Sequence, residues 1–259
     1  MLSFNDIIRQ LSRGQTPAYR LAKRIIKSIL APTVPVLPQF LRIPLRLFYE
    51  AHFLVIAVFR SILTMCYYNP LLQARCASFG REVSIDGMVF VNGPVEIHVG
   101  DRVKFGGKVN ILSGGVLDTP RLIMKDHSGV GWNTTIIVNR EVVLEEDVIV
   151  APGCHISDSD GHPREADLRA QGRPPFPEDI RPVRICRYAW IGTGAYIMKG
   201  VTIGEGCIIA ANSVVLSSIP PYCLAMGNPA EVLFRNYGRP STERKPRTPR
   251  SPVPPPNAA

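Results

Sequence analysis

The chain has 259 residues, of which 46% are hydrophobic, and its formal net charge is +9. This length and apolar content are enough for one large domain or two modest ones with a real core. They exclude a small scaffold that depends on disulfide bonds, and none of the six cysteines forms a Cys-x-x-Cys pair. We therefore expect reduced cysteines and a cytosolic compartment.

The positive charge belongs to the two ends of the chain. Residues 1–80 carry ten basic and two acidic residues, a balance of +8. Residues 81–234 carry fourteen basic and eighteen acidic residues, a balance of −4, and residues 235–259 carry six and one, a balance of +5. A partner attracted by positive charge would therefore meet the termini and not the middle of the chain.

The first 75 residues predict an N-terminal helical region. The opening "MLSFNDIIRQ" lacks the features of a signal peptide. Residues 17–30 predict an amphipathic helix capped by Thr16, with Pro17 in its first turn. Its basic face carries Arg20, Lys23, Arg24 and Lys27. The helix packs either on its own domain or on an anionic membrane surface, and the local charge favours the membrane.

Two further segments complete this N-terminal region. The four prolines of "PTVPVLPQFLRIPL" (32–45) predict an extended connector. An apolar helix is then expected over 47–68. Glu50 and Arg60 leave only nine uncharged residues between them, whereas a membrane span needs about 20. A buried or membrane-dipping helix is therefore favoured over a transmembrane one.

From Phe79 the hydrophobic period becomes six. Six is neither a helical period nor a simple strand period, and it marks a coil that turns a corner every six residues with an aliphatic side chain pointing inwards on each flat. A small or β-branched residue follows most of these positions after four residues. The repeating positions are Phe79, Ile85, Val91, Val99, Phe105, Ile111, Trp132, Val138, Leu144, Val150, Ile156, Ile185, Ile191, Ile197, Ile203, Ile209 and Val215.

The register breaks once in a way that suggests function. It runs regularly to Ile156 and resumes at Ile185, so residues 157–184 are expected to form a loop extruded from the coil. The loop begins with "SDSDGHP", and a mere spacer has no need of a histidine there. Beyond the repeats, residues 239–259 form a basic, proline-rich tail that we expect to be disordered. The tail lacks the interleaved aromatic residues that would indicate nucleic-acid binding.

The hexads, together with "WIGTGAYIMKGVTIGEGCIIAANSVVLSSIPPYCLAMGNPAEVLFR" (190–235), closely resemble the hexapeptide-repeat acyltransferases. The resemblance is greatest to the galactoside, maltose, nodulation and surface-polysaccharide O-acetyltransferases. It implies an all-β domain over 76–238, a left-handed parallel β-helix with three hexads per coil. It also implies a homotrimer with active sites between subunits, acetyl-CoA as the donor and no metal.

The resemblance implies a catalytic histidine at the root of the extruded loop. The family writes it "H-P", which corresponds to His162 followed by Pro163. A neutral imidazole within hydrogen-bond reach can take the proton of a sugar hydroxyl as it attacks a thioester, and transfer is then direct. Asp158 or Asp160 could orient the imidazole, bind the acceptor or cap the turn, with Asp158 slightly favoured for orientation.

The donor and acceptor residues are also implied by the resemblance. Trp190 matches a tryptophan near the thiol end of coenzyme A, although a buried core ring would explain it equally well. Thr193 and Ala211 match positions that line the pantetheine groove, and Arg235 lies where a basic residue pairs with the cofactor phosphates.

Two departures from the family pattern concern the phosphate site and the acceptor. Leu216 and Ser217 stand where the family often has Thr-Lys. Gly131 stands where the sugar acetyltransferases keep an asparagine, and Asn133, two residues further on, is the candidate acceptor-binding residue in its place.

The function expected is acetyl transfer from acetyl-CoA to a sugar hydroxyl in surface-polysaccharide or lipid-linked glycan synthesis. Residues 1–75 would bring this cytoplasmic enzyme to the inner face of the cytoplasmic membrane. A small acceptor such as an antibiotic, an amino acid or a free sugar is the alternative. A non-catalytic scaffold and a zinc lyase resembling the γ-type carbonic anhydrases are the rival classes, but the spacing of the histidines does not match a three-histidine zinc site.

Overall fold

A computed structural model describes residues 17, 20–21, 23–25 and 36–237. The chain divides into two compact units, Met1–Ala57 and Val58–Ala259. The boundary therefore lies inside a helix rather than near residue 75, where the composition changes. Most of the helix expected over 17–30 and the whole tail from 239 lie outside the described residues, and the residues described at 17, 20–21 and 23–25 are helical.

The apolar N-terminal segment is helical, and the helix starts earlier than the sequence predicts. Helix α3 spans Gln39–Leu63, followed by a π-helical turn η1 over Thr64–Tyr68 and helix α4 over Asn69–Arg75. The extended connector expected over 32–45 is therefore wrong from Gln39 onward. Three of its four prolines precede the helix, and Pro44 lies inside it, beyond the first turn, where it removes one intrahelical backbone hydrogen bond.

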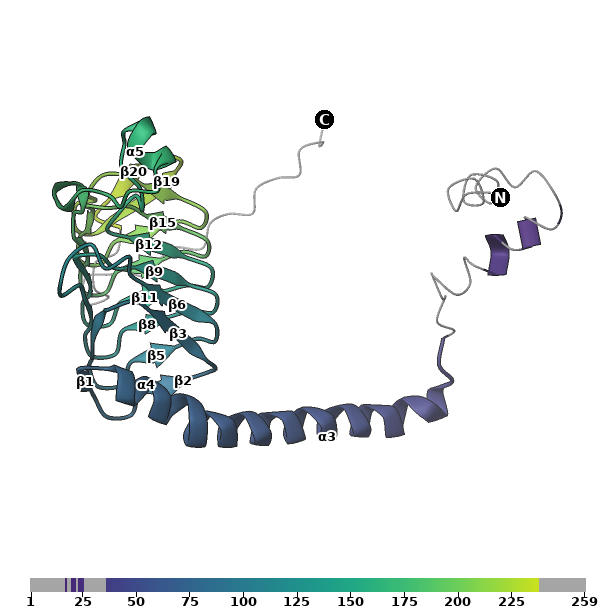
Figure 1. The fold of residues 1–259 in the computed structure, drawn as a ribbon. Helices are drawn as coiled ribbons and strands as arrows, with labels where there is room; N and C mark the ends of the chain where they lie inside the picture. Colours follow the sequence, from purple (N-terminus) through teal and green to yellow (C-terminus); the bar gives the residue numbers. More distant parts are fainter. Residues whose placement is uncertain (1–16, 18–19, 22, 26–35, 238–259) are drawn as a thin grey trace, which may run out of the picture. The chain divides into compact units, whose positions relative to one another are not determined.

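Residues 78–235 form a parallel β-helix of three sheets, whose strands succeed one another up the stack (Figure 1). The first sheet contains β1 (Ser78–Phe79), β4 (Glu96–Val99), β7 (Arg121–Met124), β10 (Glu141–Leu144), β13 (Val183–Ile185) and β16 (Thr202–Ile203). The second contains β2 (Ser84–Ile85), β5 (Lys104–Phe105), β8 (Gly129–Val130), β11 (Ile149–Val150), β14 (Trp190–Ile191), β17 (Ile208–Ile209), β19 (Cys223–Gly227) and β20 (Ala230–Arg235). The third contains β3 (Val89–Asn92), β6 (Val109–Leu112), β9 (Thr135–Ile137), β12 (His155–Ser157), β15 (Tyr196–Ile197) and β18 (Val214–Val215). Each strand up to β15 pairs in parallel with the strand three further along, so one coil uses three strands.

The core is the column of inward-pointing aliphatic side chains that the hexads predict. In the two-residue strands the second residue is buried and the first faces outward in most cases, as in Trp190–Ile191 and Tyr196–Ile197. Ile191 and Ile197 are fully buried, and burying such a side chain contributes about 1.5–3 kcal/mol.

The predicted register is wrong at one place. Val130 and Ile136 point inward, whereas Trp132 lies at a corner and is 37% exposed. Two extra residues between β9 and β10 set Ile136 and Leu144 eight positions apart, so counting back from Leu144 in steps of six gives Val138 and Trp132 instead of Ile136 and Val130. An additional loop at 113–120, which the hexad pattern did not predict, leaves the coil between β6 and β7.

Both ends of the stack are covered. At the N-terminal end Leu72 of α4 is buried against the core, and the Arg75 guanidinium donates to the carbonyls of Gly93 at 2.6 Å and Val95 at 3.1 Å. At the C-terminal end β20 turns back antiparallel on β19. These contacts satisfy backbone groups that a bare terminal coil would leave unpaired.

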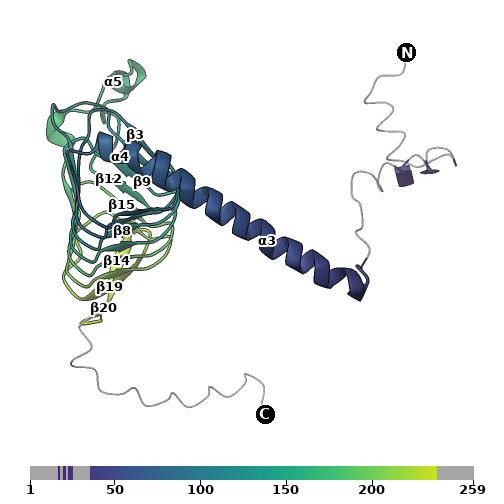
Figure 2. The ribbon, with the colours of Figure 1, turned by 90° about the horizontal axis from the view of Figure 1, so that it is seen from below.

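The extruded loop leaves the coil after Ser157 and returns at Val183. It contains the short helix α5 (Ala166–Ala170), which projects from the stack (Figure 2). It also contains a 3₁₀ turn η2 over Pro177–Asp179. Both this loop and the loop at 113–120 leave from the corner between the third and first sheets. We call this corner the loop corner.

Candidate functional site

The segment Ser157–His162 is buried over its first three residues, Ser157–Ser159, and ends in an exposed imidazole. Ser157 and Ser159 are buried, and the Ser157 hydroxyl donates to the Ser159 carbonyl at 2.5 Å. The Ser159 hydroxyl accepts the N–H of Gly161 at 3.1 Å, and Gly161 has φ +79°, a left-handed conformation that glycine adopts without strain. His162 follows and is exposed, and the next residue, Pro163, is buried again.

Asp158 holds the neighbouring turn of the coil. Its side chain is fully buried, and its carboxylate accepts the backbone N–H of Asn139 (2.8 and 3.0 Å), Arg140 (2.6 Å) and Glu141 (2.9 Å). Burial raises the pKa of this carboxyl, and the hydrogen bonds from Arg140, Asn139 and Glu141 oppose that rise. The prediction that Asp158 orients His162 does not agree with this arrangement, because backbone amides occupy the carboxylate.

Asp160 also has a different partner from the one expected. Its carboxylate lies 2.5 Å from the Nζ of Lys199, whose side chain is only 7% exposed. Lys199 belongs to the turn between β15 and β16, one coil further along the stack. No sequence pattern indicates this lysine, because it lies 39 positions after Asp160 and in the middle of an ordinary hexad.

Arginine contacts brace the rest of the extruded loop. Arg169 of α5 donates to the carbonyls of Pro163 at 3.2 Å and Arg164 at 2.7 Å. Arg164 pairs with Asp179 at 3.3 Å, which joins the outgoing and returning arms of the loop. The Arg140 guanidinium donates to the Pro177 carbonyl at 2.9 Å. The segment that carries His162 is therefore tied to both α5 and η2.

The predicted donor residues lie on adjacent coils, away from the loop corner. Trp190 is on the outer face of the second sheet and is 51% exposed, so it is not the buried core ring considered as an alternative. Thr193 and Ala211 are exposed at the corner between the second and third sheets, where the Asn212 N–H donates to the Thr193 carbonyl at 2.8 Å. Arg235 is exposed at the end of β20.

Asn133 lies at that same corner, two coils before Thr193. It has φ +56°, and its backbone N–H donates to the Gly107 carbonyl at 3.1 Å. Asparagine tolerates this left-handed conformation better than most residues, so the turn alone gives a local reason for its presence. The acceptor-binding role of Asn133 remains a prediction.

The outer face of the third sheet separates His162 from the donor residues within one chain. It carries His155, whose ring stacks on Tyr196 with centroids 5.2 Å apart and an interplanar angle of 26°. Burial lowers the pKa of His155, which favours the neutral imidazole. Tyr196 is not distinguishable by its sequence, because an outward aromatic residue fits a hexad as well as any other outward residue.

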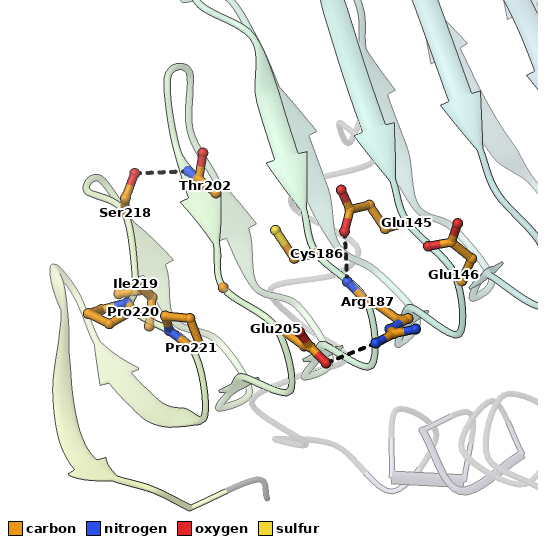
Figure 3. A pocket seen from close by; sticks show the side chains of 11 residues that line it. Glu145, Glu146, Cys186, Arg187, Thr202, Glu205, Ser218, Ile219, Pro220 and Pro221 are labelled. Carbon is orange, nitrogen blue, oxygen red and sulfur yellow. Dashed lines mark hydrogen bonds and ion pairs between the residues drawn. The ribbon is translucent and has the colours of Figure 1, made fainter.

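Two clefts lie near these features. A cleft of about 540 Å³ lies between the two long loops and is lined by residues 114–116, Leu168 and residues 173–177. A larger one, about 700 Å³, lies at the corner between the first and second sheets (Figure 3). There Arg187 is held by Glu145 and Glu205. None of the residues predicted for the active site lines this larger cleft, so size alone does not identify the site.

Among the residues that the structure describes, no group of three or more His, Cys, Asp or Glu side chains could hold a metal ion.

Comparison with known proteins gives three findings. The family model described as bacterial transferase hexapeptide (six repeats) matches residues 182–217. A probable acetyltransferase of Mycobacterium tuberculosis is 28% identical over 201 residues, which cover 71% of this chain and 64% of that protein. The galactoside O-acetyltransferase of Escherichia coli is 36% identical over 102 residues, which cover 39% of this chain and 48% of that protein. The chain thus spans less than two thirds of the length of these curated relatives.

Among solved structures, an N-acyltransferase from Bacillus cereus in complex with dTDP and coenzyme A matches with a TM-score of 0.52. The match has 16% sequence identity and covers 64% of this chain and 86% of that chain, so it shows the fold alone.

The fold and the repeats define a left-handed parallel β-helix of hexapeptide repeats, as the sequence predicts. Within that class, the predicted resemblance to the hexapeptide-repeat acyltransferases is confirmed, because the family model matches the C-terminal coils and the relatives named above carry acetyltransferase names.

Proposed function

We propose that this protein is an acetyl-CoA-dependent O-acetyltransferase whose acceptor is a sugar hydroxyl of a surface polysaccharide or lipid-linked glycan. The proposal rests on the exposed His162, which lies on a loop extruded from the coil. It follows the buried segment Ser157–Ser159, whose hydroxyl groups are hydrogen-bonded to the backbone. The likeness to a galactoside O-acetyltransferase supports acetyl transfer and a sugar acceptor.

The chemistry requires one proton acceptor and no covalent intermediate on the enzyme. The imidazole of His162 takes the proton of the acceptor hydroxyl while the hydroxyl oxygen bonds to the thioester carbonyl carbon. The carbon–sulfur bond then breaks, and the imidazolium returns the proton to the departing thiolate. General acid–base assistance of this kind contributes about 10²–10⁴-fold in rate.

A homotrimer would complete the site. In one chain, His162 lies at the loop corner, whereas Trp190, Thr193 and Ala211 lie around the opposite edge of the third sheet. Packing the loop corner of one subunit near the donor residues of the next would bring the base and the thioester together. Crosslinking and sizing of the purified protein should therefore give a trimer, and a monomer with full activity would contradict this arrangement.

We propose that the enzyme works at the cytoplasmic face of a membrane, and the exposure of helix α3 supports the attachment to a membrane. All of its residues are solvent-accessible, including Phe48, Leu54 and Phe59 at 71%, 66% and 65% exposure. The continuous helical stretch Gln39–Arg75 is long and apolar enough to cross a membrane by length and composition. We propose that α3 instead lies in the plane of the membrane surface, because its charged residues all fall on one side of the helix.

The charged residues of α3 follow a single narrow stripe. At 100° per residue, Arg42, Arg46, Glu50 and Arg60 fall within an arc of about 80° along the whole helix. An in-plane helix keeps such a stripe among the lipid headgroups while its wide apolar face enters the acyl layer. Flotation with vesicles of anionic and of neutral lipids tests this: binding should favour anionic vesicles and weaken in Arg42→Glu/Arg46→Glu, but not in the matched surface variant Lys104→Glu.

The activity is tested by measuring coenzyme A release. Full-length protein is mixed with acetyl-CoA and a crude lipid-linked glycan fraction, with His162→Ala alongside and His98→Ala as a matched surface control. Release should need the glycan, should fall at least about 10²-fold in His162→Ala, and should be unchanged in His98→Ala.

Each other result identifies a different function. A fully active His162→Ala would overturn the proposed mechanism. Release with free sugars or other small acceptors, but not with the glycan fraction, would establish the small-acceptor alternative. Absence of both release and acetyl-CoA binding would identify a non-catalytic scaffold, and zinc in the purified protein would identify the lyase.

A further inference from the structure

Buried polar side chains gather at the loop corner. Within the described part of the chain, eight polar or charged residues are buried, and five of them lie at this corner: Asn139, Ser157, Asp158, Ser159 and Lys199. Elsewhere the interior of the stack is almost wholly apolar. Polar groups in such an interior are costly unless they are hydrogen-bonded, so their concentration here indicates a specific role.

Lys199 is the only positively charged member of this group. Its ammonium is nearly removed from water and pairs with the Asp160 carboxylate at 2.5 Å. Its turn is also fixed to the returning arm of the loop, because the backbone N–H of Gly200 donates to the Arg181 carbonyl at 3.0 Å. A buried ammonium without its carboxylate would be strongly unfavourable, so the chain is constrained to keep Asp160 at this point.

We propose that Lys199 is a positioning residue for His162, acting through Asp160. This inference rests on the proposed function, in which His162 is the base. Asp160 precedes the imidazole by two residues and is anchored to the next coil, while Pro163, directly after His162, is buried. The backbone on both sides of His162 is therefore held, and the imidazole extends from a fixed point.

The buried environment distinguishes this ion pair from the others along the stack. Arg81 and Asp101, for example, lie 2.9 Å apart with the arginine side chain 88% exposed. Such exposed pairs contribute little because water and salt screen them. The pair between Lys199 and Asp160 is screened on the Asp160 side only, where the side chain is 40% exposed.

The experiment uses Lys199→Met, Asp160→Asn and the double variant in the full-length protein, with Lys199→Arg as the conservative change and Arg81→Met as the matched control. Because a misplacement of about 1 Å can cost about 10²-fold in rate, kcat should fall about 10–100-fold in each single variant. The KM for acetyl-CoA should stay within about twofold, since the donor residues lie elsewhere.

The double variant should be no slower than either single variant, because the two residues act as one unit. Lys199→Arg should recover part of the rate, and Arg81→Met should match the wild type.

A second readout does not depend on catalysis. Trypsin should cleave after Arg164 or Arg169 faster in Lys199→Met than in the wild type, while the sizing profile stays unchanged. Faster cleavage together with a fully active His162→Ala would refute the proposed mechanism and leave the positioning contact standing. Wild-type kcat and wild-type cleavage in Lys199→Met would overturn the positioning role, as would losses that multiply in the double variant.

Discussion

Replacing Asp158 by alanine should destabilise the protein far more than removing an ordinary carboxylate. The substitution leaves three backbone N–H groups without their acceptor: that of Asn139, whose hydrogen bond is buried, and those of Arg140 and Glu141, whose hydrogen bonds are partly buried. A buried, unsatisfied donor costs about 1–3 kcal/mol, so the three together cost at most about 3–9 kcal/mol. The substitution also removes a buried carboxylate whose pKa burial raises, and this relief places the net loss near the lower end of that range.

The assay is thermal unfolding followed by circular dichroism. For a domain of this size, 1 kcal/mol corresponds to about 2–4 °C in Tm, so a loss of about 3 kcal/mol should lower Tm by about 6–12 °C. The matched control is Asp118→Ala in the other long loop, where the aspartate is exposed and the change should stay within about 0.5 kcal/mol. A drop of less than about 2 °C in Asp158→Ala would refute the reasoning, because the three amides would then have found other partners.

Three further changes test the coil itself. An alanine Cβ at position 131 would lie 2.5 Å from a backbone nitrogen of the next coil, whereas at position 129 the nearest atom is 3.4 Å away. Gly131→Ala should therefore lower the free energy of unfolding, measured in urea, by about 1–3 kcal/mol, and Gly129→Ala by less than about 0.5 kcal/mol. Ile197→Ala, at a fully buried site, should lose about 2–5 kcal/mol, against a small loss for Ile149→Ala, which is 59% exposed. Burial lowers the pKa of His155 from 6.5, so its contribution to the stability of the fold is present above that pH and is lost as the pH falls below it. Tm should therefore drop more between pH 7.5 and 5 in the wild type than in His155→Phe, and equal drops would contradict this.

The coil was predictable because its period is set locally. Each hexad places one aliphatic side chain inward, so the burial of Ile191 and Ile197 can be predicted from their spacing alone. The register around Trp132 was not predictable in the same way. Apolar residues stand two positions apart there, and either set satisfies a period of six. The two extra residues between β9 and β10 decide between them, and an insertion that short does not interrupt the pattern.

The site was predictable only in part, for a related reason. The break in the register and the resemblance together indicated His162 and its loop. The partners of Asp158 and Asp160 come from other coils, 17–19 and 39 positions away. Contacts between coils follow from how the turns stack, and the sequence of a single turn does not contain that information. Helix α3 shows the opposite case. The prolines of residues 32–45 predict an extended connector from the local sequence, and that prediction places the start of the helix too late.

The covered ends of the stack determine whether the protein stays a discrete particle. Parallel coils end in rows of unpaired backbone groups, which could recruit further coils from other molecules and grow into fibrils. Helix α4, through Leu72 and Arg75, closes one end, and the reversed strand β20 closes the other. These two short segments limit the length of the stack, and a chain that lost either of them would be prone to polymerise end to end.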